Sequence, residues 1–165
     1  MLDVGAGSGR DVAFLATLHS EHQVAAVEPC EALAQLGATH TADLSVKWCD
    51  SSLPALAGVA GPFDLILLSA VWMHLPPAVR PQALARLCEL LSPEGFLIIS
   101  LRLVISKEEQ RERGMYAVSA AELCQLATEQ GMPVLLTSTE QGDAMQRPEL
   151  SWQSLILGGP LARLG

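Results

Sequence analysis

The sequence contains no apolar run long enough to cross a bilayer. Its longest apolar stretch, around Leu65 to Met73, is far shorter than the ~20 residues that a membrane-spanning helix needs. The chain also shows no charged leader followed by a cleavage site. Together these absences predict a cytoplasmic protein without a membrane partner.

Cysteines are few and stand far apart, with no C-x-x-C pair. Without a secretory leader, this spacing predicts reduced, mostly buried thiols and disfavours a disulfide framework or a zinc site. No other cluster of metal-ligand residues stands out, so we expect no metal. The four cysteines are Cys30, Cys49, Cys88 and Cys124.

Basic residues are also few: ten Lys and Arg stand against eighteen Asp and Glu, a net charge of −8. A nucleic-acid binder normally carries a basic face that neutralises phosphates. The densest basic run, from Lys107 to Arg113, is interleaved with glutamates, which is typical of a solvated, salt-bridged helix face. We therefore expect a small-molecule substrate and disfavour nucleic acid; nothing in the sequence indicates the oligomeric state.

The chain does contain a glycine-rich turn near its start. An apolar segment leads into Gly5, Gly7 and Gly9, and a helical pattern follows over 12–18. This predicts a strand, a tight turn and a helix whose first backbone N–H groups form a polar cradle for a ligand. At 165 residues we expect one domain over 1–165.

The glycine spacing separates several nucleotide-binding motifs. A dinucleotide fingerprint, G-x-G-x-x-G, needs a third glycine where this chain has Arg10, so an NAD-dependent oxidoreductase is disfavoured. No Gly-Lys-Ser/Thr follows, which excludes a Walker-type phosphate loop.

An acidic residue follows the second predicted strand, at Gln23 to Val27. Glu28 stands roughly 20 residues beyond the glycine turn, where doubly wound folds place an acid that accepts hydrogen bonds from ribose hydroxyls. The alternative is an exposed acid that caps the next helix, Glu31 to Leu36.

The remaining pattern predicts strands at 45–48, 63–69 and 96–101, with a helix from Ala78 to Leu91 between the last two. Pro81 fits that helix only in its first turn, and the turn 92–95 ends it. A capping box at Ser119 and Glu122 starts a further helix. Strands at 133–139 and 152–157 then form a long antiparallel hairpin.

These features resemble the class I S-adenosylmethionine-dependent methyltransferases. Asp3 before Gly5, Gly7 and Gly9 matches their first motif, and F-D-L-I-L-L-S-A-V-W-M-H-L-P over 63–76 resembles their fourth-strand region. The usual L-x-P-G-G turn departs here, with Glu94 in place of the first glycine. The resemblance implies a Rossmann-like α/β/α sandwich with a mostly parallel seven-stranded sheet, order 3-2-1-4-5-7-6, and an antiparallel C-terminal hairpin.

The resemblance also implies a site for S-adenosylmethionine, with S-adenosylhomocysteine as its product. The methionine portion would lie on Asp3, Gly5, Ala6, Gly7, Gly9 and Arg10, the ribose on Glu28 beside Pro29, and the adenine on Asp50 and Ser51. Backbone groups of Ser69, Ala70 and Val71 would pass near the sulfonium.

Several of these roles have alternatives. Asp50 and Ser51 also suit a plain turn, and Arg10 suits a surface salt bridge to Asp11 or Glu28. His74 is the candidate catalytic base, with a loop histidine bonded to backbone or solvent as the alternative. Trp72 fits a substrate wall or the core equally well.

Family members usually carry helices before the first strand, and here the motif follows Met1 directly. We therefore expect a domain without the usual N-terminal helical segment. This leaves two hypotheses: a methyltransferase acting on an unidentified small molecule, or a cofactor-binding module without catalytic activity.

Overall fold

The computed structural model describes the chain except residues 19–22, 144–146, 148 and 163–165. Helices and strands alternate along the N-terminal half, as the sequence predicted. The elements are β1 (Leu2–Val4), α1 (Arg10–Leu18), β2 (Val24–Val27), α2 (Glu31–His40), β3 (Val46–Cys49), β4 (Phe63–Ser69), the 3₁₀ helices η1 (Trp72–His74) and η2 (Pro77–Val79), α3 (Arg80–Leu90), β5 (Leu91–Arg102), α4 (Lys107–Glu112), α5 (Ala120–Glu129), β6 (Val134–Thr137), β7 (Gln141–Gly142) and β8 (Ser151–Gly158).

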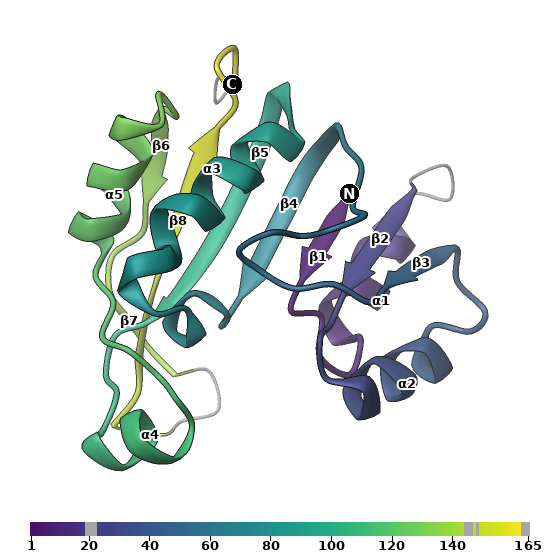
Figure 1. Cartoon of the computed structure of the whole chain (residues 1–165), viewed down its shortest axis with the longest axis horizontal. Helices are drawn as coiled ribbons and strands as arrows, with labels where there is room; N and C mark the ends of the chain where they lie inside the picture. Colours follow the sequence, from purple (N-terminus) through teal and green to yellow (C-terminus); the bar gives the residue numbers. More distant parts are fainter. Residues whose placement is uncertain (19–22, 144–146, 148, 163–165) are drawn as a thin grey trace.

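One sheet runs through the molecule in the order β3-β2-β1-β4-β5-β8-β6 (Figure 1). Strands β1 to β5 are parallel, whereas β8 is antiparallel to β5, to β6 and to the two-residue β7. The predicted order 3-2-1-4-5-7-6 is thus confirmed, with β8 as its seventh strand. The strand order reverses at β1, between β2 and β4, which is where such sheets form a ligand crevice.

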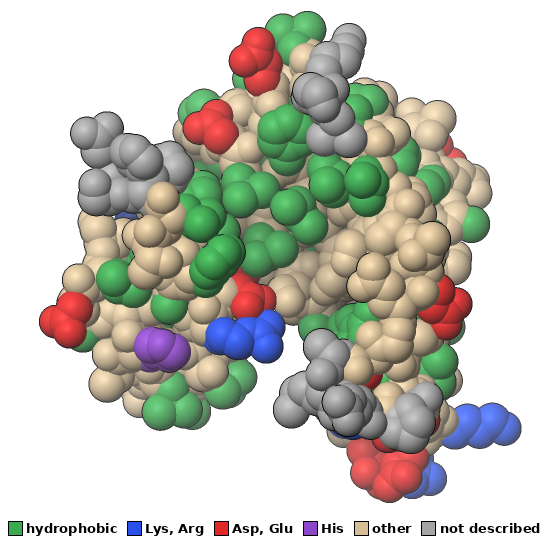
Figure 2. Space-filling model, turned by 180° about the vertical axis from the view of Figure 1, so that it is seen from behind, with side chains coloured by type: hydrophobic (Ala, Val, Ile, Leu, Met, Phe, Trp, Pro, Cys, Tyr) green, Lys and Arg blue, Asp and Glu red, His purple; other side chains and the backbone are tan. Residues whose placement is uncertain are grey.

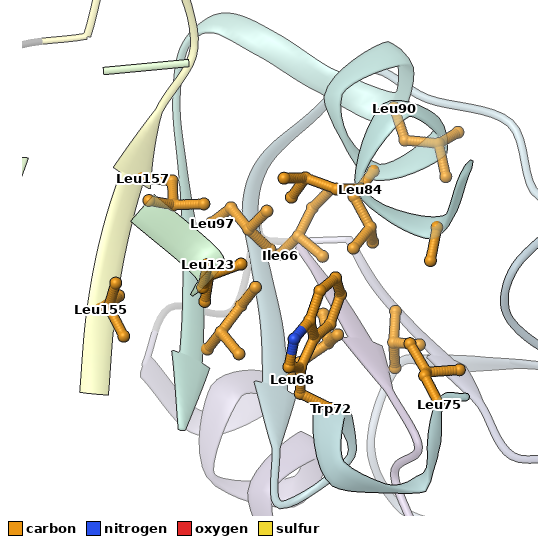
Figure 3. Close-up of a cluster of buried hydrophobic side chains, with 14 of the residues drawn as sticks. Ile66, Leu68, Trp72, Leu75, Leu84, Leu90, Leu97, Leu123, Leu155 and Leu157 are labelled. Atoms are coloured by element: carbon orange, nitrogen blue, oxygen red, sulfur yellow. The ribbon is translucent and has the colours of Figure 1, made fainter. Parts of the chain in front are cut away.

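Helices α3 and α5 cover one face of the sheet (Figure 1). Alternate residues of each strand point to the same face, and on this face they are buried aliphatic side chains, chiefly leucine, isoleucine and valine. Trp72 of η1 packs among them, and the cluster is closed by Leu84 of α3 and Leu123 of α5 (Figure 3). The labelled strand members are Ile66, Leu68, Leu97, Leu155 and Leu157.

The opposite face is less covered. Val12 and Leu15 of α1 are buried there in a second cluster, against which the half-buried Leu65 and Leu67 pack. Toward β5 and β8, the side chains on this face stay half-buried, and Figure 2 shows apolar side chains over the middle of it. The glycine turn lies beside this face, at the start of α1.

Helix α3 follows the prediction, because Pro81 falls in its first turn. The strand after it does not. We expected residues 92–95 to form a turn, but β5 already starts at Leu91, which pairs with Phe63. The extra residues are absorbed by a register shift between Phe63 and Leu65, a bulge that lengthens one strand against its partner.

The predicted capping box at Ser119 is only half formed. The Ser119 hydroxyl accepts from the Glu122 amide at 3.1 Å, but the Glu122 carboxylate bonds Arg80, at 2.7 Å from both oxygens. The Arg80 side chain is 1% exposed, so a buried guanidinium competes successfully for the carboxylate. A complete capping box occurs instead at Ser106 and Glu109, at the start of α4.

Two further sequence expectations concern thiols and membranes. The four cysteines are free: Cys30 is exposed, and Cys49, Cys88 and Cys124 are half-buried, so the thiols are less buried than predicted. Among the described residues, no helix combines the length and the apolar character that crossing a membrane would require.

Candidate functional site

The glycine turn joins β1 to α1 in a backbone conformation that side chains disfavour. Gly5, Gly7 and Gly9 have φ of +75°, +56° and +87°, the left-handed region that glycine adopts without strain. The Gly5 and Ala6 amides donate to the Val27 carbonyl at 2.8 and 3.0 Å. These bonds hold the turn against the end of β2.

Glu28, at the end of β2, holds the same turn through its side chain. Its Oε2 accepts from the Gly7 amide at 2.8 Å, and its Oε1 accepts from the Cys30 amide at 2.9 Å, at the start of α2. The residue is 8% exposed, so it is not the solvent-exposed acid of the alternative. A carboxylate offers about four lone-pair sites, so two remain for a ligand.

Glu28 lines a cavity of about 440 Å³ at the carboxyl ends of β1, β2 and β4. A Cβ built on Gly7, which also lines this cavity, would meet no atom within 4 Å. The backbone is therefore open to a ligand at this position. The cavity is lined by Val4, Gly5, Gly7, Val27, Glu28, Pro29, Leu33, Ser52, Leu53, Ala70, Val71, His74 and Leu75.

A second hollow of about 250 Å³ shares the glycine turn and continues toward α1. Asp3 lies on it and is 1% exposed; its Oδ2 has no hydrogen-bond partner among the described residues. Burial, with a smaller contribution from the charge of Asp11, raises the pKa of Asp3 to about 7. A buried carboxylate oxygen without a donor is costly unless a ligand supplies one. The hollow is lined by Asp3, Gly5, Ala6, Gly7, Ser8, Arg10, Asp11, Ser69 and Ala70.

The chain between β4 and η1 borders both hollows. Ala70 has φ of +60°, a strained value for a residue with a side chain, and its amide donates to Ser100 Oγ at 2.9 Å. Ser69 bonds the Asp11 carboxylate, and Asp11 has a lowered pKa chiefly because of its bond to Arg10. The predicted segment Ser69, Ala70 and Val71 therefore does reach the site.

His74, the predicted base, lines the larger cavity. The backbone carbonyl of Arg113 lies near its imidazole. Partial burial lowers its pKa, and the nearby positive charges of Arg113 and Arg102 act in the same direction. The imidazole is therefore neutral at pH 7, the form in which one ring nitrogen can accept a proton.

Some of the predicted residues do not line the larger cavity. Arg10 pairs with Asp11 at 2.7 Å, and its side chain is 80% exposed, so its salt-bridge partner is Asp11 and not Glu28, while its role toward a ligand stays a prediction. Asp50 is exposed, and neither Asp50 nor Ser51 lines the larger cavity. The Ser51 hydroxyl donates to the Ala57 carbonyl at 3.0 Å. Their adenine role stays a prediction. Trp72 is fully buried and belongs to the core.

The prediction missed several residues that line the larger cavity. Leu33 of α2, Ser52 and Leu53 are among them. Leu33 is 40% exposed, and an apolar helix residue gives no sequence signal that it faces a ligand instead of the core. Among the described residues, no group of three or more His, Cys, Asp or Glu side chains is arranged to hold a metal ion.

Comparison with known proteins points in one direction. The model of a family described as "Methyltransferase domain" matches residues 1–95, more than half of the chain. A search among curated proteins gives no significant match.

Solved structures share the fold at low sequence identity. The N-methyltransferase NodS from Bradyrhizobium japonicum WM9, in complex with S-adenosyl-L-homocysteine, is 17% identical with a TM-score of 0.76, over 96% of this chain and 76% of that chain. A putative methyltransferase bound to the Haloferax volcanii Trm112 activator is 14% identical with a TM-score of 0.79, over 96% and 81%. Magnesium protoporphyrin IX methyltransferase from Synechocystis PCC 6803, with bound SAM, is 16% identical with a TM-score of 0.69, over 94% and 68%.

Proposed function

Because the chain belongs to the methyltransferase domain family, we propose that it transfers a methyl group to a small-molecule acceptor at the carboxyl edge of its sheet, with His74 as general base. Family membership confirms the enzyme class and the cofactor that the sequence predicted, S-adenosylmethionine. The acceptor and the roles of individual residues are our proposal.

The observation that carries the proposal is that two acidic residues, Glu28 and Asp3, lie on the two hollows that share the open glycine turn. Glu28 keeps lone pairs available in the larger cavity, which suits the two hydroxyl donors of a ribose. Asp3, on the adjoining hollow, has a carboxylate oxygen without a partner among the described residues, which suits an ammonium group. The donor set therefore fits an adenosyl group at one end and an amino-acid group at the other.

The other proposed contacts follow from position. The backbone of Gly5, Ala6, Gly7 and Gly9 would hold the amino-acid portion, with Arg10 available to its carboxylate. Pro29 would flank the ribose, Asp50 and Ser51 would hold the adenine, and Ser69, Ala70 and Val71 would pass beside the reacting atoms.

When bound, S-adenosylmethionine supplies a methyl group on a sulfonium leaving group that is already activated. The remaining contribution of the protein is to orient the two reactants, which can supply about 7–11 kcal/mol of the barrier. His74 would accept the proton of the acceptor, because its imidazole is neutral and lines the larger cavity. Such a base contributes roughly a hundred- to ten-thousandfold.

Charge supports a small acceptor over a nucleic acid. The chain carries a net charge of −8, which repels a polyanion at long range. The site itself is bounded by the acids Asp3, Asp11 and Glu28.

A binding panel tests the proposal. S-adenosylmethionine and S-adenosylhomocysteine should raise the melting temperature, whereas NAD and ATP should not. Stabilisation by NAD alone would favour the oxidoreductase hypothesis. Binding of the cofactor without methyl transfer to any member of a small-molecule acceptor library would favour the binding module.

A further inference from the structure

The chain segment after α4 is docked against η1, the element that carries His74. The Tyr116 amide donates to the Met73 carbonyl at 2.8 Å, and Met115 and Met73 are both buried in the main core. The Arg113 carbonyl also lies near the His74 imidazole, where it favours the protonated ring and so raises its pKa. The position of the His74 ring therefore depends on where residues 113–116 are held.

One carboxylate, that of Glu109, adds side-chain contacts that help to hold this segment. Its Oε1 accepts from Arg102 Nη2 at 2.5 Å and lies 3.6 Å from Arg113 Nη1. Its Oε2 accepts from the Ser106 amide at 3.0 Å, and its backbone carbonyl accepts from the Arg113 amide at 3.0 Å. Glu109 thus joins the end of β5, the start of α4 and the residue whose carbonyl lies near His74.

The anchor on the sheet is rigid. Arg102 is 9% exposed at the end of β5, where it pairs with Trp152 of β8, two residues beyond the last pair with β4. Arg113, by contrast, has a side chain that is 59% exposed. Charge-assisted hydrogen bonds are stronger than neutral ones. The carboxylate of Glu109 therefore ties the exposed segment to the buried guanidinium at the end of β5.

We propose that Glu109 is a positioning residue for His74. By joining Arg102 to Arg113 it holds the Arg113 carbonyl against one ring nitrogen of His74 and leaves the other nitrogen free to accept a proton. This inference rests on the proposed function, because it concerns the base of that reaction. It also separates two effects of Arg113: the carbonyl orients the ring, whereas the guanidinium disfavours the imidazolium.

The charged groups around the ring set the expected direction of change. Arg102 and Arg113 face it from β5 and from the segment after α4, Glu109 neutralises both, and Glu28 is the other ionisable residue on the cavity wall. Removing the charge of Glu109 leaves two cations uncompensated and loosens the carbonyl. Both changes lower the pKa of His74.

Nitrogen NMR of the full chain labelled with ¹⁵N-histidine tests this. The His74 signals are those that His74→Gln removes. In the unaltered chain at pH 7.5 one ring nitrogen should be protonated and the other not. In Glu109→Gln the two signals should move toward their average, and the pKa should fall by roughly half a pH unit or more. Glu108→Gln removes an equal charge from the same turn of α4 and should change neither.

Arg113→Ala provides the opposite test, because it keeps the carbonyl and deletes the cation. There the single tautomer should persist and the pKa of His74 should rise. A His74 ring in Glu109→Gln that matches the one in Glu108→Gln overturns the positioning role. Full methyl transfer by His74→Gln instead overturns the base in the proposed function, so the two failures are distinguishable.

Discussion

Asp3→Asn should stabilise the ligand-free chain at alkaline pH while weakening its cofactor site. The amide side chain would keep nearly the same shape and could still accept the Val12 amide that bonds Asp3, but it would not ionise. The Asp3 side chain is almost fully buried, and one of its oxygens has no donor among the described residues. The cost of the ionised form is therefore a cost to folding.

The size of the effect follows from the pKa of Asp3, raised from 3.8 to about 7 by burial. Below pH 4 the carboxyl is protonated in both the folded and the unfolded chain. Between pH 4 and 7 only the folded chain holds the proton, so each pH unit lowers the free energy of unfolding by about 1.36 kcal/mol. From pH 5 to 8 the loss is roughly 2–3 kcal/mol, and it stops growing once the folded carboxyl is ionised as well.

Urea denaturation at pH 5 and pH 8 measures this directly. The free energy of unfolding of the unaltered chain should fall between these values by roughly 2–3 kcal/mol more than that of Asp3→Asn. The histidines and the other acids titrate in both chains and cancel in the comparison. Equal pH slopes in the two chains would refute the burial argument for Asp3. With S-adenosylhomocysteine present, its ammonium should favour the ionised form, so affinity should rise with pH only in the unaltered chain.

Three further predictions test the site. Glu28→Gln leaves the Gly7 or the Cys30 amide without its acceptor, so calorimetry should show ~10- to 100-fold weaker binding of S-adenosylhomocysteine; unchanged affinity contradicts the ribose role. His74→Gln should lower turnover roughly a hundredfold or more with cofactor affinity intact, and in the unaltered enzyme activity should rise with pH through a pKa below the ordinary histidine value, reaching its plateau by about pH 7. Gly7→Ala should cost about 1–2 kcal/mol of stability but block the cofactor, whereas Gly5→Ala, whose Cβ would overlap a Val71 methyl, should unfold at a clearly lower temperature. Equal melting temperatures for the two glycine variants would contradict this contrast.

The sheet and the acids around the glycine turn could be predicted because local sequence determines them. The almost continuous apolar run over 63–69 predicts a strand, and β4 has these bounds, although Leu65 and Leu67 on one of its faces are only half-buried. Glu28 follows from its distance to the turn, since a strand, a turn and a helix have nearly fixed lengths. Where spacing alone places a group, the prediction and the structure agree.

What could not be predicted depends on contacts distant in sequence. The start of β5 at Leu91 overrides the turn chemistry of residues 92–95, because pairing with Phe63 offers hydrogen bonds that no local pattern shows. Glu122 matched a capping box, but Arg80, 42 residues earlier in the chain, takes its carboxylate. Glu109 likewise lies in a run of alternating charges whose partners only the folded chain selects.

The site contains two features that oppose folding, and a buried side chain that favours folding lies close in sequence to one of them. Ala70 holds a strained φ and Asp3 an oxygen without a partner in the described part of the chain, each worth about 1–3 kcal/mol against folding. Two residues beyond Ala70, Trp72 is fully buried among the leucines beneath α3, and burial of its apolar surface favours folding, although its Nε1 also lacks a partner among the described residues. The tryptophan thus shapes the site from the core, because it fixes where the chain leaves β4 and where η1 presents His74. A residue can influence the geometry of a site without lining it. The sequence offered a substrate wall or a core role for Trp72; the core role is the one observed, and from the core the side chain also supports the loop that carries His74.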